Sequence, residues 1–449
     1  MSAALRRLNH SSLACARAEL GPVNKARLMA GMLKAISGTV LARIATTAMG
    51  LLVAVVAGHR LGAEGLGVIG LVVLGITLVR LGMDLMGGGA LIYLVPRVPL
   101  RKLLPPCYAW AVVATVAGWG ILTLLHLVPE GYALHVAALG LIQSIGAIHM
   151  SVLVGQQRIR ANNYIAVVQA VVLVAAFAYL ARVPDADAMA YVHAAYLSAA
   201  STLVLGSWAI SKQAPTRAHG QVNVLRILLR QGLYVQLANG MQLMNYRLAY
   251  WLIERFRSTS MLGIYTVANQ LAEGAWLVPK SLALVLYSKI SNTRHREVQR
   301  TLTLTFLKTS IAFSTICVLA LLALPSTVFQ WVFGPEVTGI TPLVALLSPG
   351  ILAMAATQAY SHFFSGTARN VHNVIGSGLG LLATLATGFT LIPRFGMAGA
   401  AISATCAYGI NAMYQTVAFM RITGTTFGDL WPGKKDVEQL KALYSMLRR

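Results

Sequence analysis

Charged residues are scarce in this chain, and acidic residues are the scarcest. Only 11% of the 449 residues are charged, and 13 Asp and Glu stand against 36 Lys and Arg, for a formal net charge of +23. A water-soluble domain carries about 25% charged residues. The few charges of this chain could therefore not cover the surface of a soluble protein of this length. A basic excess also occurs in nucleic-acid-binding proteins. Here the basic residues form short clusters between apolar runs, so we expect no nucleic-acid partner.

Cysteine pairs and catalytic motifs are also missing. The four cysteines, Cys15, Cys107, Cys317 and Cys406, lie far apart and form no CxxC pair, which argues against a metal or redox site. No Walker A, HExxH or GxSxG sequence occurs. We therefore expect no enzyme, no cofactor, no bound metal and no hydrolysis of ATP.

Long apolar runs dominate the sequence. Hydrophobic residues make up 57% of the chain, and a helix needs roughly 20 apolar residues to span the hydrocarbon core. We predict an all-α polytopic membrane protein with about twelve transmembrane helices in two pseudo-symmetric six-helix bundles. The expected spans are 36–57, 66–88, 104–128, 132–154, 163–181 and 189–210, then 233–253, 261–286, 303–327, 340–362, 372–392 and 397–419.

Basic residues alternate between the loops and so indicate the orientation. With the N-terminus in the cytoplasm, the inside segments hold 26 Lys and Arg and the outside loops hold five. Cytoplasmic loops are enriched in Lys and Arg, and anionic membrane lipids attract such clusters. We therefore predict cytoplasmic N- and C-termini. The expected division is a cytoplasmic N-terminal segment (1–34), an N-terminal bundle (35–211), a cytoplasmic linker (212–232), a C-terminal bundle (233–420) and a cytoplasmic tail (421–449).

The two blocks of six spans share a sequence pattern. A shift of 196 residues places Leu66-Gly67-Val68-Ile69 on Leu262-Gly263-Ile264-Tyr265, and both tetrapeptides open the second span of their block. Parallel repeats of this kind occur in transporters, with the substrate site between the halves. Chance matching of apolar sequence is the alternative explanation.

Four short motifs stand out: the loop 60–67 (RLGAEGLG), 81–84 (LGMD), 262–269 (LGIYTVAN) and 392–401 (IPRFGMAGAA). These motifs resemble those of polysaccharide-biosynthesis (Wzx-like) flippases of the multidrug/oligosaccharidyl-lipid/polysaccharide exporter superfamily. Their order and spacing across residues 30–425 carry the resemblance. It implies a multi-pass protein of the bacterial inner membrane. Such a protein moves an undecaprenyl-diphosphate-linked oligosaccharide to the periplasmic leaflet by alternating access, for O-antigen lipopolysaccharide or exopolysaccharide assembly.

Ionisable and amide side chains inside the spans are the candidate functional residues, because a charge in the hydrocarbon is costly unless it faces a cavity or a partner. Arg43 shares a helical face with Thr39, and either binds the lipid diphosphate as a guanidinium can or snorkels to the interface. Span seven carries a polar stripe, in which Asn239 falls on Arg43 under the 196-residue shift. The members of the stripe are Gln236, Asn239, Gln242 and Tyr246.

Span eight carries Asn269, Glu273 and Lys280 at helical spacing. Glu273 lies near the bilayer midplane and is either a protonation switch for H+ or Na+ coupling or one half of a buried pair with Arg247 or Arg43. Arg247 itself is either an outer phosphate ligand or a snorkelling anchor. In many members of the family an acidic residue stands next to a basic one in span seven. Here the sequence is Asn245-Tyr246-Arg247, which leaves ion coupling at that position unassigned.

The second span ends with Arg80 and Asp84, one helical turn apart. They form either a local ion pair or, through Asp84 and its shift mate Lys280, a gate between the bundles. We assign Arg43, Asn239, Gln242, Arg247, Asn269 and Lys280 to substrate binding, and Glu273, Asp84 and Arg80 to coupling or gating.

Two other functions remain open at this point. One is a related exporter that carries a drug or a peptidoglycan lipid precursor. The other is a membrane-embedded polysaccharide glycosyltransferase or ligase, although the outside loops are short and hold few carboxylates. A polysaccharide polymerase of the same pathway is the expected protein partner.

Overall fold

The computed structural model describes residues 22–431, apart from 97, 185, 212–223, 368 and several positions between 277 and 294. All secondary structure in these residues is helical. This confirms the predicted all-α class. Residues 1–21 of the predicted N-terminal segment and 432–449 of the predicted tail lie outside the described part of the chain.

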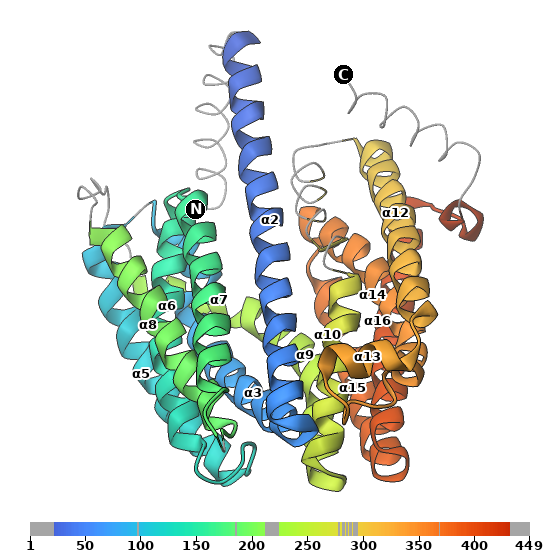
Figure 1. Ribbon diagram of the computed structural model, residues 1–449. Coiled ribbons are helices and arrows are strands. Elements are labelled where there is room, and N and C mark those ends of the chain that lie inside the picture. Colours follow the sequence, from blue (N-terminus) through green and yellow to red (C-terminus); the bar gives the residue numbers. More distant parts are fainter. Residues whose placement is uncertain are drawn as a thin grey trace.

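The first group of helices comprises the first six spans and one short helix. Figure 1 shows α5, α6, α7 and α8 on one side of the molecule, with α2 rising along its middle. The helices are α2 (Pro22–Arg60), α3 (Gly62–Gly87), the short α4 (Gly89–Leu94), α5 (Leu100–Leu124), α6 (Ala133–Gly155), α7 (Ile159–Leu180) and α8 (Met189–Ser211).

The second group lies on the other side of the molecule (Figure 1). After α10, the described positions Pro279, Lys280, Ala283, Leu286 and Ile290 are helical again. The remaining elements are α9 (Val224–Phe256), α10 (Thr259–Ala275), α12 (Arg296–Ala323), the short α13 (Ser326–Phe333), α14 (Ile340–Gly366), α15 (Val371–Phe395), α16 (Met397–Thr423) and the 3-10 helix η1 (Phe427–Leu430).

Nine helices in the described part of the chain are long and apolar enough to cross a membrane: α2 from Gly38, α3, α5, α6, α7, α8, α12, α14 and α15. Together with α9, α10 and its continuation, and α16, they form the two six-helix bundles. Helices are the expected solution, because backbone groups in hydrocarbon must be paired within the segment. Apolar side chains such as Leu41, Leu134 and Ile316 remain exposed, as a lipid-facing surface requires.

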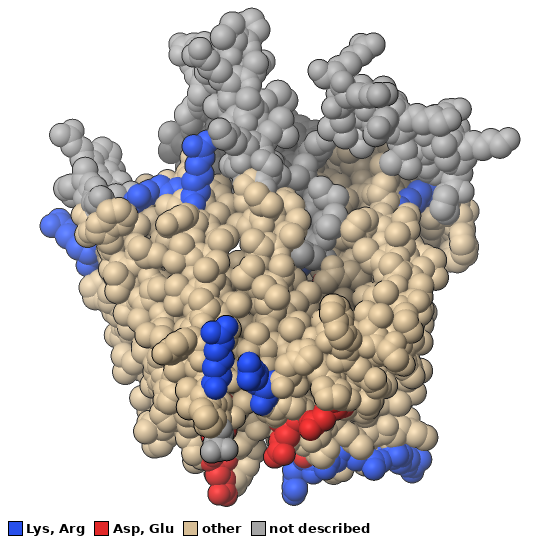
Figure 2. Space-filling model, in the orientation of Figure 1, with Lys and Arg blue, Asp and Glu red and all other residues tan. Residues whose placement is uncertain are grey.

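The two ends of the molecule differ in their charged residues. We call the end where α2 begins the upper end and the end where α2 finishes, at Arg60, the lower end, as in Figure 1. For the described residues, Figure 2 shows only blue charged side chains (Lys and Arg) at the upper end, red (Asp and Glu) and blue side chains at the lower end, blue side chains in the lower half of the body, and a band of uncharged residues above these. Which end faces the cytoplasm stays a prediction.

Two of the expected boundaries differ from the structure. Helix α2 begins at Pro22 and α9 at Val224, so parts of the predicted N-terminal segment and of the predicted linker are helical. Both stretches are rich in Lys and Arg, which lowered the apolar signal without lowering helix propensity.

Candidate functional site

Two glycines let the bundles touch backbone to backbone at the lower end. A Cβ on Gly67 of α3 would lie 2.0 Å from the carbonyl oxygen of Thr259, and a Cβ on Gly263 of α10 would lie 1.9 Å from the carbonyl oxygen of Ala63. No larger residue fits either position without a shift of the helices. Small residues at helix crossings permit this close approach in membranes.

These contacts follow the sequence repeat. Under the 196-residue shift, Gly67 becomes Gly263 and Ala63 becomes Thr259, so each of the two contacts turns into the other. Gly70, one turn further along α3, faces its own shift mate Thr266, whose Cγ2 lies 2.8 Å from a Cβ built on Gly70. Residues exchanged in this way surround a pseudo-twofold axis. The axis therefore passes between α3 and α10, and chance no longer explains the repeat.

A second set of contacts joins the first bundle to α13 at the same end. The His59 ring Nε2 donates to the carbonyl oxygens of Trp331 and Val332, at 3.0 and 3.1 Å. The backbone N–H of Ala63, in the first turn of α3, donates to Glu336 Oε2 at 2.8 Å. A carboxylate at a helix N-terminus is favoured by the helix dipole. We call these contacts, together with the glycine crossing, the lower seal.

Above the lower seal, a cavity of about 360 Å³ lies between the bundles, lined mainly by polar residues whose apolar carbons also face it. We call it the seam cavity. Its walls are the later turns of α3 and the middle of α9. Arg80 and Asp84 face Asn239 and Gln242 across it, and Asn239 donates to Gln236 Oε1 at 3.1 Å. The lining residues are Thr77, Arg80, Leu81, Asp84, Gln236, Asn239, Gln242 and Leu243.

A second cavity, of about 390 Å³, lies inside the first bundle and shares Arg80 and Asp84 with the seam cavity. We call it the bundle cavity. No ion pair within 4 Å joins Arg80 to Asp84, or Asp84 to Lys280, among the described residues. The Nε of Arg80 is buried without a hydrogen-bond partner. Neither the local pair nor the gate pair is formed in this conformation, so both side chains remain directed to the two cavities.

An ion pair links α9 to α10 between the seam cavity and the lower seal. Arg247 Nη2 lies 3.0 Å from Glu273 Oε1. Tyr250 accepts a hydrogen bond from Arg247, and the guanidinium also stands over the Tyr250 ring at 5.0 Å. Asn269 donates to both Glu273, at 2.9 Å, and the Tyr250 hydroxyl, at 3.3 Å. The network satisfies the charges at this depth, and Arg247 with Tyr250 also lines a small cavity of about 80 Å³ next to Gly70.

Asn245, two residues before Arg247 on α9, is buried and binds α15: it donates to the carbonyl oxygen of Ser377 at 3.1 Å and accepts from Thr384 at 3.2 Å. Ser377 in turn donates to Gln242 Oε1 at 2.8 Å. The span-seven position therefore has a packing role, and Glu273 of α10 provides the carboxylate for Arg247.

Two of the predicted site residues, Arg43 and Lys280, lie away from these cavities, and one member of the polar stripe, Tyr246, has no described side chain. Arg43 lines neither the seam cavity nor the bundle cavity, and α2 at this level packs on α7, where Asn163 donates to Thr39 at 3.0 Å. Lys280 is exposed beyond the end of α10 and lines neither cavity. The side chain of Tyr246 is outside the described part. The structure thus brings together Asn239, Gln242, Arg80 and Asp84, and separately Arg247, Asn269 and Glu273.

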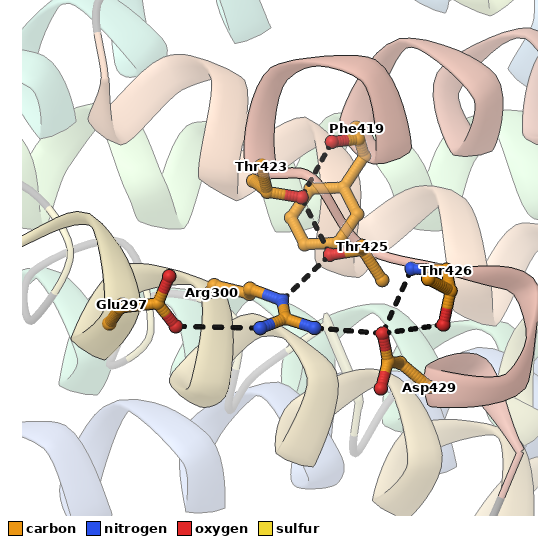
Figure 3. A network of polar contacts seen from close by, with 7 residues as sticks. All are labelled: Glu297, Arg300, Phe419, Thr423, Thr425, Thr426 and Asp429. Carbon is orange, nitrogen blue, oxygen red and sulfur yellow. Dashed lines mark hydrogen bonds and ion pairs between the residues drawn. The ribbon is translucent and has the colours of Figure 1, made fainter.

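One polar network, at the upper end, was not predicted from the sequence (Figure 3). Arg300 Nη2 lies 2.8 Å from Asp429 Oδ2, and Arg300 Nε donates to Thr425 at 3.0 Å. The backbone N–H and hydroxyl of Thr426 both donate to Asp429, and these bonds, with Arg300 beside them, lower the pKa of that carboxyl. The network fixes η1 to the start of α12, outside the spans.

The lining amides of the bundle cavity and the residues of the lower seal were also missed. Glu336 lies in the loop after α13, and His59 lies in the last turn of α2, just past the predicted span 36–57, so sequence reasoning expects solvated side chains at both positions. The glycine crossing did carry a signal, because Gly67 and Gly263 are shift mates near the start of equivalent helices.

No protein-family model and no curated protein matches this sequence. Solved structures match its fold. An inward-facing multidrug resistance MATE family transporter of the MOP superfamily superposes with a TM-score of 0.64 at 14% identity, over 86% of this chain and 98% of that one. The lipid II flippase MurJ, in an inward closed conformation, gives 0.67 at 14% identity, over 87% and 88%. A mutant of the Vibrio cholerae MATE transporter VcmN gives 0.58 at 13% identity, over 90% and 99%.

These likenesses establish the fold: the chain is a multi-pass membrane protein with the fold of MOP-superfamily transporters and flippases. The proteins that share the fold are named as transporters or a flippase rather than as enzymes. The predicted two-bundle architecture is confirmed.

Proposed function

We propose that this chain is a flippase for a polyprenyl (undecaprenyl) diphosphate-linked oligosaccharide. It would move its cargo from the cytoplasmic to the periplasmic leaflet of a bacterial inner membrane by alternating access. The observation that carries the proposal is the seam cavity, a space between two repeat-related bundles that is lined mainly by polar residues and closed at one end by the lower seal. A carrier that exposes one site to one side at a time needs this arrangement.

The distribution of charge supports an inward-facing conformation. The basic loop residues Arg101, Lys102, Arg158 and Arg160 stand at the upper end, where the helices that carry them begin. If the positive-inside bias sets the orientation, the upper end is cytoplasmic and the lower seal is periplasmic. The seam cavity then lies on the cytoplasmic side of the seal, where the lipid-linked cargo is made.

The polar groups of the seam suit a charged head group that is drawn through hydrocarbon. Arg80 supplies a guanidinium with an unused donor, and guanidinium groups bind phosphate in a bidentate manner. Asn239 and Gln242 add donors on the opposite wall. Lipid tails would remain in the bilayer while the head group crosses between the bundles.

Ion coupling is part of the proposal and is assigned to Glu273. Arg247 forms an ion pair with the Glu273 carboxylate and donates a hydrogen bond to the Tyr250 hydroxyl. Protonation or Na+ binding at Glu273 would break the ion pair and release Arg247 toward the cavities. A half-buried ion pair whose members also bind neighbouring polar groups can act as such a switch.

The likeness to MurJ favours a lipid-linked cargo and keeps a peptidoglycan lipid precursor as the second candidate. A drug exporter is third, because neither of the two larger cavities is lined by an aromatic side chain, whereas drug-sized sites are largely apolar and aromatic.

Deletion of the gene, followed by analysis of lipid-linked intermediates, tests the function. Accumulation of the oligosaccharide lipid on the cytoplasmic leaflet is expected. Complementation by Asp84→Ala or Arg80→Ala should fail, while the same substitution at Arg182, in an outer loop, should complement. Disappearance of the lipid intermediate would instead indicate a glycosyltransferase. Accumulation of the peptidoglycan precursor would identify the second candidate.

A further inference from the structure

The bundle cavity is a feature that the proposed function does not use. It lies among α3, α4, α6, α7 and α8, and no helix of the second bundle contributes to it. Its volume of about 390 Å³ falls in the range of about 300–1,000 Å³ that small-molecule sites occupy. The lining residues are Arg80, Asp84, Gly88, Ile92, Gln143, Ala147, Met150, Ser151, Val154, Asn162, Gln169, Ala199 and Thr202.

Three amide side chains supply most of the uncharged hydrogen-bonding groups that line this cavity. Gln143 of α6 and Gln169 of α7 are half-buried, and their amides make no hydrogen bond with any described residue. Asn162 makes only a long contact of 3.5 Å with its neighbour Asn163. The three amides are half-buried rather than sealed from the cavity, so they can hydrogen-bond to water or to a ligand there.

The composition of the lining disfavours two kinds of ligand. The charged pair Arg80 and Asp84 stands where the two cavities meet, and the rest of the bundle-cavity lining carries no charge, so a phosphate has no cation to bind deeper in this cavity than Arg80. No Phe, Tyr or Trp lines the cavity, which disfavours a flat aromatic compound. Each amide offers both donors and an acceptor, and this combination matches neutral groups rich in hydroxyls.

The two cavities share a boundary. Arg80 and Asp84 line both, so a ligand whose phosphates lie in the seam cavity could place an attached group in the bundle cavity. A head group made of a diphosphate joined to sugars has these two chemistries in this order.

We propose that the bundle cavity is a saccharide subsite, which takes a neutral, polyhydroxylated portion of the cargo while the diphosphate stays in the seam cavity. This inference rests on the proposed function. Gln143, Asn162 and Gln169 bind the sugar hydroxyls, and Arg80 stands where the two portions join. Only residues of the first bundle therefore contact the sugar.

Thiol protection tests the subsite in the full-length protein in nanodiscs. In a variant without its native cysteines, Ala147→Cys places a thiol in the bundle cavity and Leu243→Cys places one in the seam cavity. Each is treated with a small thiol reagent. The probes are undecaprenyl diphosphate and the same lipid carrying a single N-acetylglucosamine. At a concentration about ten times the Kd, a protected thiol should react about tenfold more slowly, because only the unliganded fraction reacts.

Both lipids should protect the thiol at position 243, and only the glycosylated lipid should protect the thiol at position 147. Protection at 243 by both lipids, with equal protection or none at 147, would overturn the subsite and leave the flippase proposal standing. Failure of both lipids to protect 243 would overturn the flippase proposal and the subsite with it.

A substitution provides an independent measurement. Gln169→Leu should weaken binding of the glycosylated lipid by about 2- to 10-fold, the usual effect of one lost hydrogen bond, and leave binding of the bare lipid unchanged. Gln330→Leu on α13 is the matched control and should change neither. An equal loss for both lipids in Gln169→Leu would show a general structural effect and contradict the proposal.

Discussion

Replacing a glycine of the lower seal by alanine should open that end of the molecule. In Gly263→Ala the new methyl carbon would lie 1.9 Å from the carbonyl oxygen of Ala63. Contacts below 3.0 Å do not persist, so the helices must separate by more than 1 Å. The clashing atom belongs to the backbone, and no change of rotamer relieves it. Overpacking of this kind costs about 1–3 kcal/mol, which corresponds to a shift of about 5- to 150-fold against the closed lower end.

Thiol labelling from the lower side measures the opening. Gln270→Cys, in a variant without native cysteines, places a thiol in the small cavity above the seal, and a membrane-impermeant maleimide reaches it only when the seal opens. Gly263→Ala should raise the labelling rate by about 5-fold or more. Gly120→Ala is the matched control, because a Cβ there meets nothing within 4 Å, and its rate should stay at the wild-type value.

The pseudo-twofold axis makes the prediction stricter. Gly67→Ala produces the equivalent clash, at 2.0 Å from the carbonyl oxygen of Thr259, and should raise the rate by a similar factor. The labelling rate of the double variant should rise by less than the product of the two single-variant factors, because one separation of the helices relieves both clashes. A wild-type labelling rate in either single variant, at wild-type expression and thermal stability, would refute the assignment of this crossing as the seal.

Three further outcomes are expected. Glu273→Ala should abolish export and lower the Tm, because it leaves Arg247 without its carboxylate. The double variant with Arg247→Ala should recover part of the lost Tm. A double-mutant cycle that shows no coupling energy between the two residues would contradict the ion pair. The lowered pKa of Asp429 means that its contribution to holding η1 is complete above the usual value of 3.8 and is lost as pH falls through the lower folded value. The hydrogen-exchange protection factor of η1, which corrects for the intrinsic pH dependence of exchange, should therefore be constant from pH 8 to 5. Asp429→Asn should lower this protection factor at pH 7, unlike Asp187→Asn in the loop between α7 and α8. Glu336→Gln should weaken the lower seal and speed the same maleimide labelling, and unchanged labelling would show that its bond to α3 is dispensable.

The two bundles could be predicted from the sequence alone, because membrane spans are recognised by their length and apolar content. The repeat could also be predicted, since Gly67 and Gly263 stand at equivalent places. The Arg247–Glu273 pair was one of two alternatives for Glu273, and only the geometry of α9 and α10 selects it. Helical spacing could not do so, because it orders residues on one helix and says nothing about the rotation of the next.

Arg43 shows the limit of the repeat argument. It is the shift mate of Asn239, which lines the seam cavity, yet Arg43 lines neither cavity, and α2 at this level packs on α7. The repeat fixes which helices are equivalent, but each bundle can tilt its first helix differently. The cavity amides were missed for a related reason: Gln143, Asn162 and Gln169 stand singly on different helices and form no stripe.

The two bundles share the seal but differ in their interiors, and this difference bears on mechanism. In the upper half of the second bundle, Tyr360, Phe363 and Phe419 are fully buried, with ring centroids 5.2 and 4.9 Å apart for the two pairs that include Phe419. They come from α14 and α16, the counterparts of α6 and α8. The interior of the first bundle instead holds the bundle cavity, which is lined by amides and contains no ring. A packed aromatic core resists deformation, while a hollow polar one can accept a ligand. The proposed carrier is therefore symmetric where it closes and asymmetric where it binds: the second bundle acts as a rigid body that rocks about α3 and α10, and selection among sugars depends on the first.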